Sequence, residues 1–331
     1  MLTFLAGAEV DTQVMKEKFK ESFLIGFTSF LAPFLGAMAY CYYVLNWTPE
    51  AAKVTGVTLS TTSLAVVYAV LVETGLTETK IGKIIMASCF VTDMGTALAL
   101  SLLFIEFNWL TLVFLVVSAL MIAVVPRIAP IIFQRYGDRV IEPEIKFLFM
   151  ILFIFTGLAK LGASHAILPA FVFGLVLSKM FSANRLLQRR LRVVAFAFIT
   201  PFFFINGGMN VSLKLLLANF GLLVQLLLVK QVTKIFGTYH LAKKYVTQDA
   251  MYTTLLMSTG LTMGTISSVF GLQAGYITQA QFSVIVAVVV LSAIIPTVIA
   301  QRRLQPKVEF IGTEEMKQPV TLLNGEENQG S

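Results

Sequence analysis

The chain carries a series of apolar stretches, most of them close to twenty residues long, separated by short polar segments. A helix of about 20 apolar residues spans the roughly 30 Å hydrocarbon core of a bilayer. The stretches do not alternate apolar and polar residues as barrel strands do. Of the residues, 57% are hydrophobic and only 13% are charged, against about 25% charged in soluble domains. The sequence therefore predicts an all-α polytopic membrane protein.

Eleven apolar segments can be delimited, which predicts about 10–11 transmembrane helices. They are residues 1–9, 22–45, 54–72, 81–105, 108–126, 145–161, 164–179, 191–209, 213–242, 250–271 and 279–300. The first is too short to span a bilayer, so we expect that upstream residues complete it and that the first helices are absent from this chain. We expect residues 1–303 to form the membrane domain and residues 304–331 to be a disordered tail.

The basic residues predict the topology. The net charge of +7 would suit nucleic-acid binding, but Lys and Arg lie mainly between the apolar segments. Loops after the odd-numbered segments hold 20 of the 25 basic residues, loops after the even-numbered segments hold 3, and Lys230 and Lys234 lie inside segment nine. Because loops rich in Lys and Arg face the cytoplasm, the odd loops and the C-terminus are predicted to be cytoplasmic.

Two segments are poor continuous helices, because each is rich in hydroxyl groups and interrupted by glycine at membrane depth. One contains Thr61 and Thr62, and the other contains Ser258 and Thr259. Such interruptions predict discontinuous helices that cross at the binding site of a secondary transporter. The alternative is that small residues only permit close helix packing. Each interrupted segment is followed by a glycine-containing loop and another helix, so segments two to four and nine to eleven are predicted to be inverted three-helix repeats.

Asp93 is the only acidic residue between residues 81 and 105. A carboxylate near the middle of a membrane helix is costly, and by default it indicates a functional site. It can hold a proton or an alkali cation, and competition between the two is sufficient for exchange. We assign Asp93 and its neighbour Thr92 to the predicted ion- and proton-binding site. Thr92 cannot titrate, which favours one-for-one, electroneutral exchange. The alternative is a structural carboxylate that is satisfied by hydrogen bonds between helices.

Lys230 and Lys234 lie four residues apart, on one face of a helix. An intramembrane lysine needs a partner, a cavity or a route to the interface. We expect one of them to face Asp93 or the crossing, the alternative being that they reach the interface along their aliphatic stems. The sequence holds no nucleotide-binding fingerprint in a strand–helix context. It therefore predicts a gradient-driven transporter with no cofactor, rather than an enzyme or an ATP-driven pump.

Four short motifs carry a family resemblance. They are Phe4-Leu5-Ala6-Gly7-Ala8-Glu9-Val10-Asp11, Val91-Thr92-Asp93, Pro201-Phe202-Phe203-Phe204-Ile205-Asn206-Gly207-Gly208-Met209 and Lys234-Ile235-Phe236-Gly237. With them the chain resembles the monovalent cation:proton antiporter-2 family, in its Kef/Nap-like branch, over residues 1–303. Thr92 departs from the Asp, Asn or Gln usual at its position.

The resemblance implies a homodimer in a bacterial plasma membrane, with a core domain and a dimerisation domain. It implies exchange of Na⁺ or K⁺ for protons by alternating access, with membrane lipid around the protein and no nucleic acid as partner. It makes Asp93 the ion carrier and Lys234 the buried lysine, with Lys230 as second choice, and puts Thr61, Thr62, Ser258 and Thr259 at the crossing. Two alternatives stay open: a channel or organic-anion symporter with the same layout, and a non-transporting truncated membrane subunit.

Overall fold

The computed structural model describes residues 1–9, 18–77, 79–104, 109–137, 142–161, 166–304 and 306, and its regular elements are all helical. Apart from Leu304 and Pro306, the predicted tail lies outside the described residues. The elements are α1 (Leu2–Ala8), α3 (Phe19–Ala39), π-turn η1 (Tyr40–Val44), α4 (Pro49–Ser60), α5 (Leu64–Glu73), α6 (Lys80–Leu103), α7 (Trp109–Tyr136), α8 (Pro143–Leu161), α9 (Ile167–Ala183), α10 (Arg185–Val194), π-turn η2 (Ala195–Ile199), α11 (Thr200–Met209), α12 (Leu213–Ala218), α13 (Phe220–Val246), 3-10 turn η3 (Thr247–Asp249), α14 (Ala250–Met257), α15 (Thr262–Gln273) and α16 (Gln279–Arg303).

Within the described residues, seven stretches are long and apolar enough to cross a membrane. They are Phe19–Val44, Pro49–Glu73, Lys80–Leu103, Trp109–Tyr136, Leu186–Met209, Phe220–Gln273 and Gln279–Arg303. The predicted number of ten or eleven is larger because it separates α13 from α14 and α15 and also counts α1, α8 and α9. The helical membrane fold that the sequence predicts is therefore confirmed.

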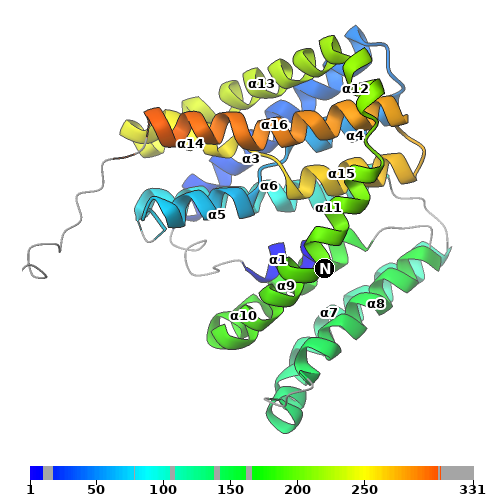
Figure 1. Ribbon diagram of the computed structural model, residues 1–331. Helices are drawn as coiled ribbons and strands as arrows, with labels where there is room; N and C mark the ends of the chain where they lie inside the picture. The colour runs from blue at the N-terminus through cyan, green and yellow to red at the C-terminus, as the bar shows by residue number, and fades with distance from the viewer. Residues whose placement is uncertain are drawn as a thin grey trace, which may run out of the picture.

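The helices form two bodies (Figure 1). The first, which we call the crossing bundle, comprises α3 to α6 and α13 to α16. The second, which we call the lateral body, contains α1 and α7 to α10, and its core includes Phe4, Phe155 and Phe173. A smaller apolar cluster joins the two, because Phe90 and Met263 of the crossing bundle pack with Phe171 of α9. The seam between the bodies runs past the helix that carries Asp93.

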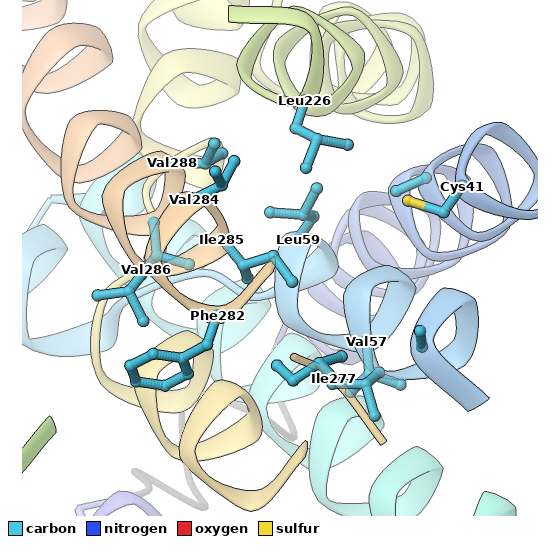
Figure 2. Packing of buried hydrophobic residues seen from close by; sticks show 14 of the residues in the cluster. Cys41, Val57, Leu59, Leu226, Ile277, Phe282, Val284, Ile285, Val286 and Val288 are labelled. Atoms are coloured by element: carbon cyan, nitrogen blue, oxygen red, sulfur yellow. The ribbon is translucent and has the colours of Figure 1, made fainter. Parts of the chain in front are cut away.

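The main core of the crossing bundle is built from branched aliphatic side chains. Figure 2 shows Leu59 of α4 beside Ile285 of α16, with Leu226 of α13 above them and Val57 of α4 below. All four are fully buried. Burying such a side chain stabilises the fold by about 1.5–3 kcal/mol relative to exposure in water. In a membrane, a side chain outside the core would face apolar lipid rather than water, so much of the stabilisation comes from the close packing of the side chains. The core therefore fixes α4 firmly up to Ser60, where the helix breaks.

The two predicted three-helix repeats share local details. After each broken helix the chain turns at a glycine with positive φ, 70° at Gly75 and 72° at Gly275. In both turns the next residue donates its N–H to a carbonyl five residues back, from Leu76 to Leu71 and from Tyr276 to Gly271. This is the Schellman ending, in which glycine adopts the left-handed conformation without a Cβ clash. Lys80 and Lys83 follow the first turn, whereas no basic residue closely follows the second turn. The charge rule therefore puts the two turns on opposite sides of the membrane.

Candidate functional site

Two broken helices cross in the middle of the crossing bundle. Helix α4 ends at Ser60 and α5 begins at Leu64, with extended backbone at Thr61 between them. Helix α14 ends at Met257 and α15 begins at Thr262. The two interruptions are joined by a backbone hydrogen bond of 3.1 Å from the Ser63 N–H to the Thr259 carbonyl. The predicted discontinuous helices are thus present, and they touch at their breaks.

Thr62 links three elements at the crossing. Its hydroxyl donates to the Met257 carbonyl at the end of α14, at 2.9 Å. It also accepts a hydrogen bond of 2.9 Å from Nζ of Lys234, which comes from α13. Lys234 donates a second bond, of 3.1 Å, to the Ser29 hydroxyl of α3. Lys234 is fully buried and does not reach an interface along its stem, so its ammonium group belongs to the crossing.

Lys230 lies one helical turn from Lys234 and is also fully buried. Its Nζ donates to the Ser292 hydroxyl of α16 at 2.7 Å. It lies close to Gly260, since a Cβ built on that glycine would be 2.6 Å from Nζ and 2.9 Å from the Thr61 carbonyl oxygen. Glycine is therefore required there by close approach rather than by its φ angle. Both lysines sit where the carbonyl ends of α4 and α14 meet, and positive charge is favourable at a helix C-terminus.

Asp93 borders a cavity of about 100 Å³ on the other side of Thr62. Asp93 is 3% exposed, and its Oδ1 accepts no hydrogen bond within the described part of the chain. A buried carboxylate oxygen without a protein partner is suited to hold a proton, an ion or a water. The cavity is lined by Leu2, Leu5, Ala6, Glu9, Thr62, Leu64, Ala65, Asp93, Phe196, Thr200, Phe204, Leu261, Thr262 and Met263.

The cavity receives the positive ends of two half-helices. The first residues of α5, Leu64 and Ala65, line it together with the first residues of α15, Thr262 and Met263. Helix N-termini carry a partial positive charge and free N–H groups. The N-cap residue of α15, Leu261, provides no side-chain hydrogen bond to these groups. The crossing therefore directs two positive helix ends to the side of the carboxylate and two negative ends to the side of the lysines.

The other residues assigned to the site from the sequence have local partners. The Thr92 hydroxyl donates to the Cys89 carbonyl of its own helix at 2.6 Å, and Thr92 is not among the residues that line the cavity. Thr61, Ser258 and Thr259 likewise donate to carbonyls three or four residues back, at 2.8 Å each. These three hydroxyls satisfy carbonyls exposed by the breaks. Thr62 alone among the four crossing hydroxyls has a side-chain bond to another element within the described residues.

A second carboxylate, which was not among the site residues predicted from the sequence, lines the same cavity. Glu9 lies at the end of α1 and accepts a hydrogen bond of 2.6 Å from Nε of Arg192 on α10. The guanidinium also lies over the ring of Tyr68 on α5, 5.1 Å from its centre. Asp93 lies within electrostatic range of both Glu9 and Lys234. The signal in the sequence was Glu9 itself, which is part of the first family motif.

Comparisons with known proteins identify the family of the chain. Residues 1–303 match the family model described as sodium/hydrogen exchanger, transmembrane. The chain is 26% identical to "Probable Na(+)/H(+) antiporter 3" of Methanocaldococcus jannaschii, over 91% of this chain and 80% of that protein. It is 23% identical to "Na(+)/H(+)-K(+) antiporter GerN" of Bacillus cereus, over 89% of this chain and 78% of that protein.

A solved structure shares the fold. The sodium proton antiporter MjNhaP1 from Methanocaldococcus jannaschii superposes with a TM-score of 0.63, over 92% of this chain and 84% of that chain, at 16% identity. At that identity the likeness shows the fold alone. The family match confirms the broad resemblance to cation:proton antiporters, whereas the antiporter-2 family and its Kef/Nap-like branch are not confirmed, since the matching model is that of the sodium/hydrogen exchangers.

Proposed function

Because the chain belongs to the sodium/hydrogen exchanger family, we propose that it is a secondary active antiporter that exchanges Na⁺ or K⁺ for protons. The observation that carries the proposal is the buried Asp93 carboxylate with its unpartnered oxygen, on a cavity that two half-helix N-termini line. A cation and a proton compete for this carboxylate. The Kef/Nap-like branch rests on the four motifs alone, and the NhaP name of the structural relative speaks against it.

Asp93 is the residue that carries the ion and the proton in this proposal. Lys234 and Lys230 hold the carbonyl ends of the crossing, and Thr62 couples the Lys234 ammonium to the cavity side. Thr92 is a weaker candidate for an ion ligand, because its hydroxyl is engaged within α6. Glu9 is paired with Arg192, so the proposal assigns the exchange of ion and proton to Asp93 alone, which supports one-for-one, electroneutral exchange.

Alternating access follows from the position of the cavity at the seam. Residues of the crossing bundle form one wall, and α1 with α11 forms the other. Sliding of the crossing bundle along the lateral body would carry Asp93 from one side of the membrane to the other. We further propose that the lateral body mediates dimerisation, that residues 1–303 form the transport domain and that the C-terminus lies in the cytoplasm of a bacterial cell.

Proteoliposomes with a trapped pH-sensitive dye test the function. Addition of Na⁺ or K⁺ should dissipate an imposed pH gradient with wild-type protein and should have no effect with Asp93→Asn. The matched control is Asp249→Asn, which changes the same side chain on the turn between α13 and α14. Normal exchange by Asp93→Asn would refute the proposal. Voltage-dependent cation flux without proton counterflow would indicate a channel. The absence of any ion flux would indicate a non-transporting subunit.

A further inference from the structure

The Glu9–Arg192 pair closes one end of the Asp93 cavity. Three helical segments that line the cavity each contribute one residue at this end, namely Glu9, Arg192 and Tyr68. On α1, Leu2, Leu5 and Ala6 line the wall and Glu9 continues the same face, three residues on. On the opposite helix, Phe196 and Thr200 line the wall, and Arg192 lies four residues before Phe196.

The third wall supplies Tyr68. Leu64 of α5 lines the cavity, and Tyr68 lies one helical turn beyond it, under the Arg192 guanidinium. Glu9, Arg192 and Tyr68 therefore form one layer across the cavity. The layer lies at the end toward the start of α10, whose residues 185–192 include four arginines, and the charge rule assigns this basic segment to the cytoplasmic side.

We propose that Glu9 is a second cation-binding carboxylate, through which the cation passes between the cytoplasm and Asp93, with Arg192 as its resident counter-ion. This inference rests on the antiporter function proposed above. A carboxylate is a hard oxygen ligand for alkali cations, and it cannot fully satisfy a guanidinium and a metal ion together. An arriving cation releases Arg192 from Glu9. The guanidinium then has a ready resting place on the Tyr68 ring, since an arginine is attracted to an aromatic face.

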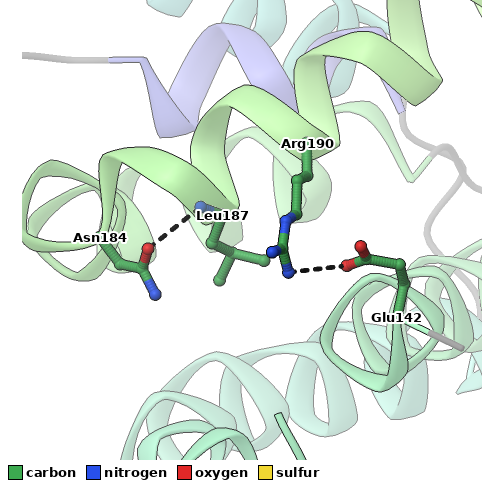
Figure 3. A network of polar contacts seen from close by, with 4 residues as sticks. All are labelled: Glu142, Asn184, Leu187 and Arg190. Atoms are coloured by element: carbon green, nitrogen blue, oxygen red, sulfur yellow. Dashed lines mark hydrogen bonds and ion pairs between the residues drawn. The ribbon is translucent and has the colours of Figure 1, made fainter. Parts of the chain in front are cut away.

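The position of the Glu9–Arg192 pair allows Glu9 to exchange the guanidinium for a cation. The Arg192 side chain is 35% exposed and that of Glu9 is 14% exposed. A cation can thus reach the pair from water, while the carboxylate faces the cavity. By contrast, Arg190 on the same helix pairs with Glu142 at 3.4 Å, away from the cavity, with side chains that are 32% and 35% exposed (Figure 3). Glu142→Gln is therefore the matched control.

The first test measures the apparent KM for Na⁺ at each face, in everted and right-side-out vesicles. At the cytoplasmic face, Glu9→Gln should raise the KM about fivefold, which corresponds to about 1 kcal/mol, and Arg192→Gln should lower it. The KM at the outer face and that of Glu142→Gln should equal the wild-type values. A merely structural pair would change the KM in the same direction in both variants. The proposal would be overturned if both variants changed the KM in the same direction, if neither variant changed the KM, or if the KM changed equally at the two faces.

The second test needs no transport. Both native cysteines are buried, so a cysteine placed by Ala6→Cys reports on the cavity. Its labelling rate by a cationic thiol reagent, divided by the rate with a neutral reagent of similar size, measures cation attraction at the layer. This ratio should rise with Arg192→Gln, fall with Glu9→Gln and stay constant with Glu142→Gln. If wild-type protein exchanges no ions, the antiporter function fails, and the ratio still decides whether Glu9 attracts cations. Equal ratios in all variants would refute the role of Glu9.

Discussion

Replacement of Thr62 by valine tests whether the crossing is held by its side-chain hydrogen bonds. The hydroxyl donates to the Met257 carbonyl and accepts from Lys234 Nζ, both at 2.9 Å, and the site is fully buried. A hydrogen bond to a charged group is worth about 1.5–3 kcal/mol, and a buried carbonyl left unpaired costs about 1–3 kcal/mol. Lys234 keeps its bond to Ser29, which offsets part of the first loss. We expect Thr62→Val to cost about 3 kcal/mol of unfolding free energy.

The neighbouring threonine provides the control. Thr61 is equally buried, but its hydroxyl donates to the Thr58 carbonyl of its own helix at 2.8 Å. Thr61→Val should cost only about 0.5–1.5 kcal/mol, the net value of one neutral hydrogen bond. Unfolding by SDS in mixed micelles measures both. A double-mutant cycle with Lys234→Met should give a coupling of about 1–3 kcal/mol with Thr62 and almost none with Thr61. Equal costs for the two threonines, or no coupling to Thr62, would refute the reasoning.

Two further predictions concern the carboxylate and the close approach at the crossing. If a proton and Na⁺ compete at Asp93, acidification should raise the apparent KM for Na⁺. The rise should be about tenfold per pH unit in the pH range where the proton is the main occupant of the site. An apparent KM that is constant with pH would contradict competition. Gly260→Ala should destabilise the protein by about 1–3 kcal/mol, because its Cβ would lie 2.9 Å from the Thr61 carbonyl oxygen, which cannot move away as a side chain can. Gly208→Ala, which meets nothing within 4 Å, should cost nothing in the same thermal or SDS unfolding assay.

The sequence predicts the crossing well because its causes are local. A cluster of hydroxyl groups with glycine at membrane depth favours an interruption of the helix, so the breaks around Thr61 and Ser258 are indicated by the local sequence. The Schellman glycines and the lysine distribution are also local, and they reveal the repeat. Asp93 stands out because a lone carboxylate is costly in any membrane helix. For these features no knowledge of the tertiary arrangement is needed.

The wall of the cavity opposite Asp93 could not be predicted in this way. It is formed by α1 and α11, which are about 190 residues apart in the chain and meet only through tertiary packing. Arg192 is one of several arginines in a basic segment, and nothing in the sequence distinguishes it from Arg190. Only the fold shows that one pairs beside the cavity and the other away from it. The role of Thr92 stays a prediction, and its adjacency to Asp93 in sequence puts it on another side of α6.

The crossing also explains why positive and negative groups separate across so short a distance. Two half-helices that cross at their breaks bring two C-terminal ends together on one side and two N-terminal ends together on the other. The lysines compensate the carbonyl ends, because they are fully buried and bonded there. Of the two N-terminal ends, that of α5 is capped by the uncharged Ser63 hydroxyl and that of α15 has no side-chain cap, and Asp93 supplies one negative charge beside them. In the proposed mechanism, a cation that neutralises Asp93 competes with the helix ends as well as with the proton. This keeps cation binding weak enough to be reversible, which an exchanger requires at every turnover.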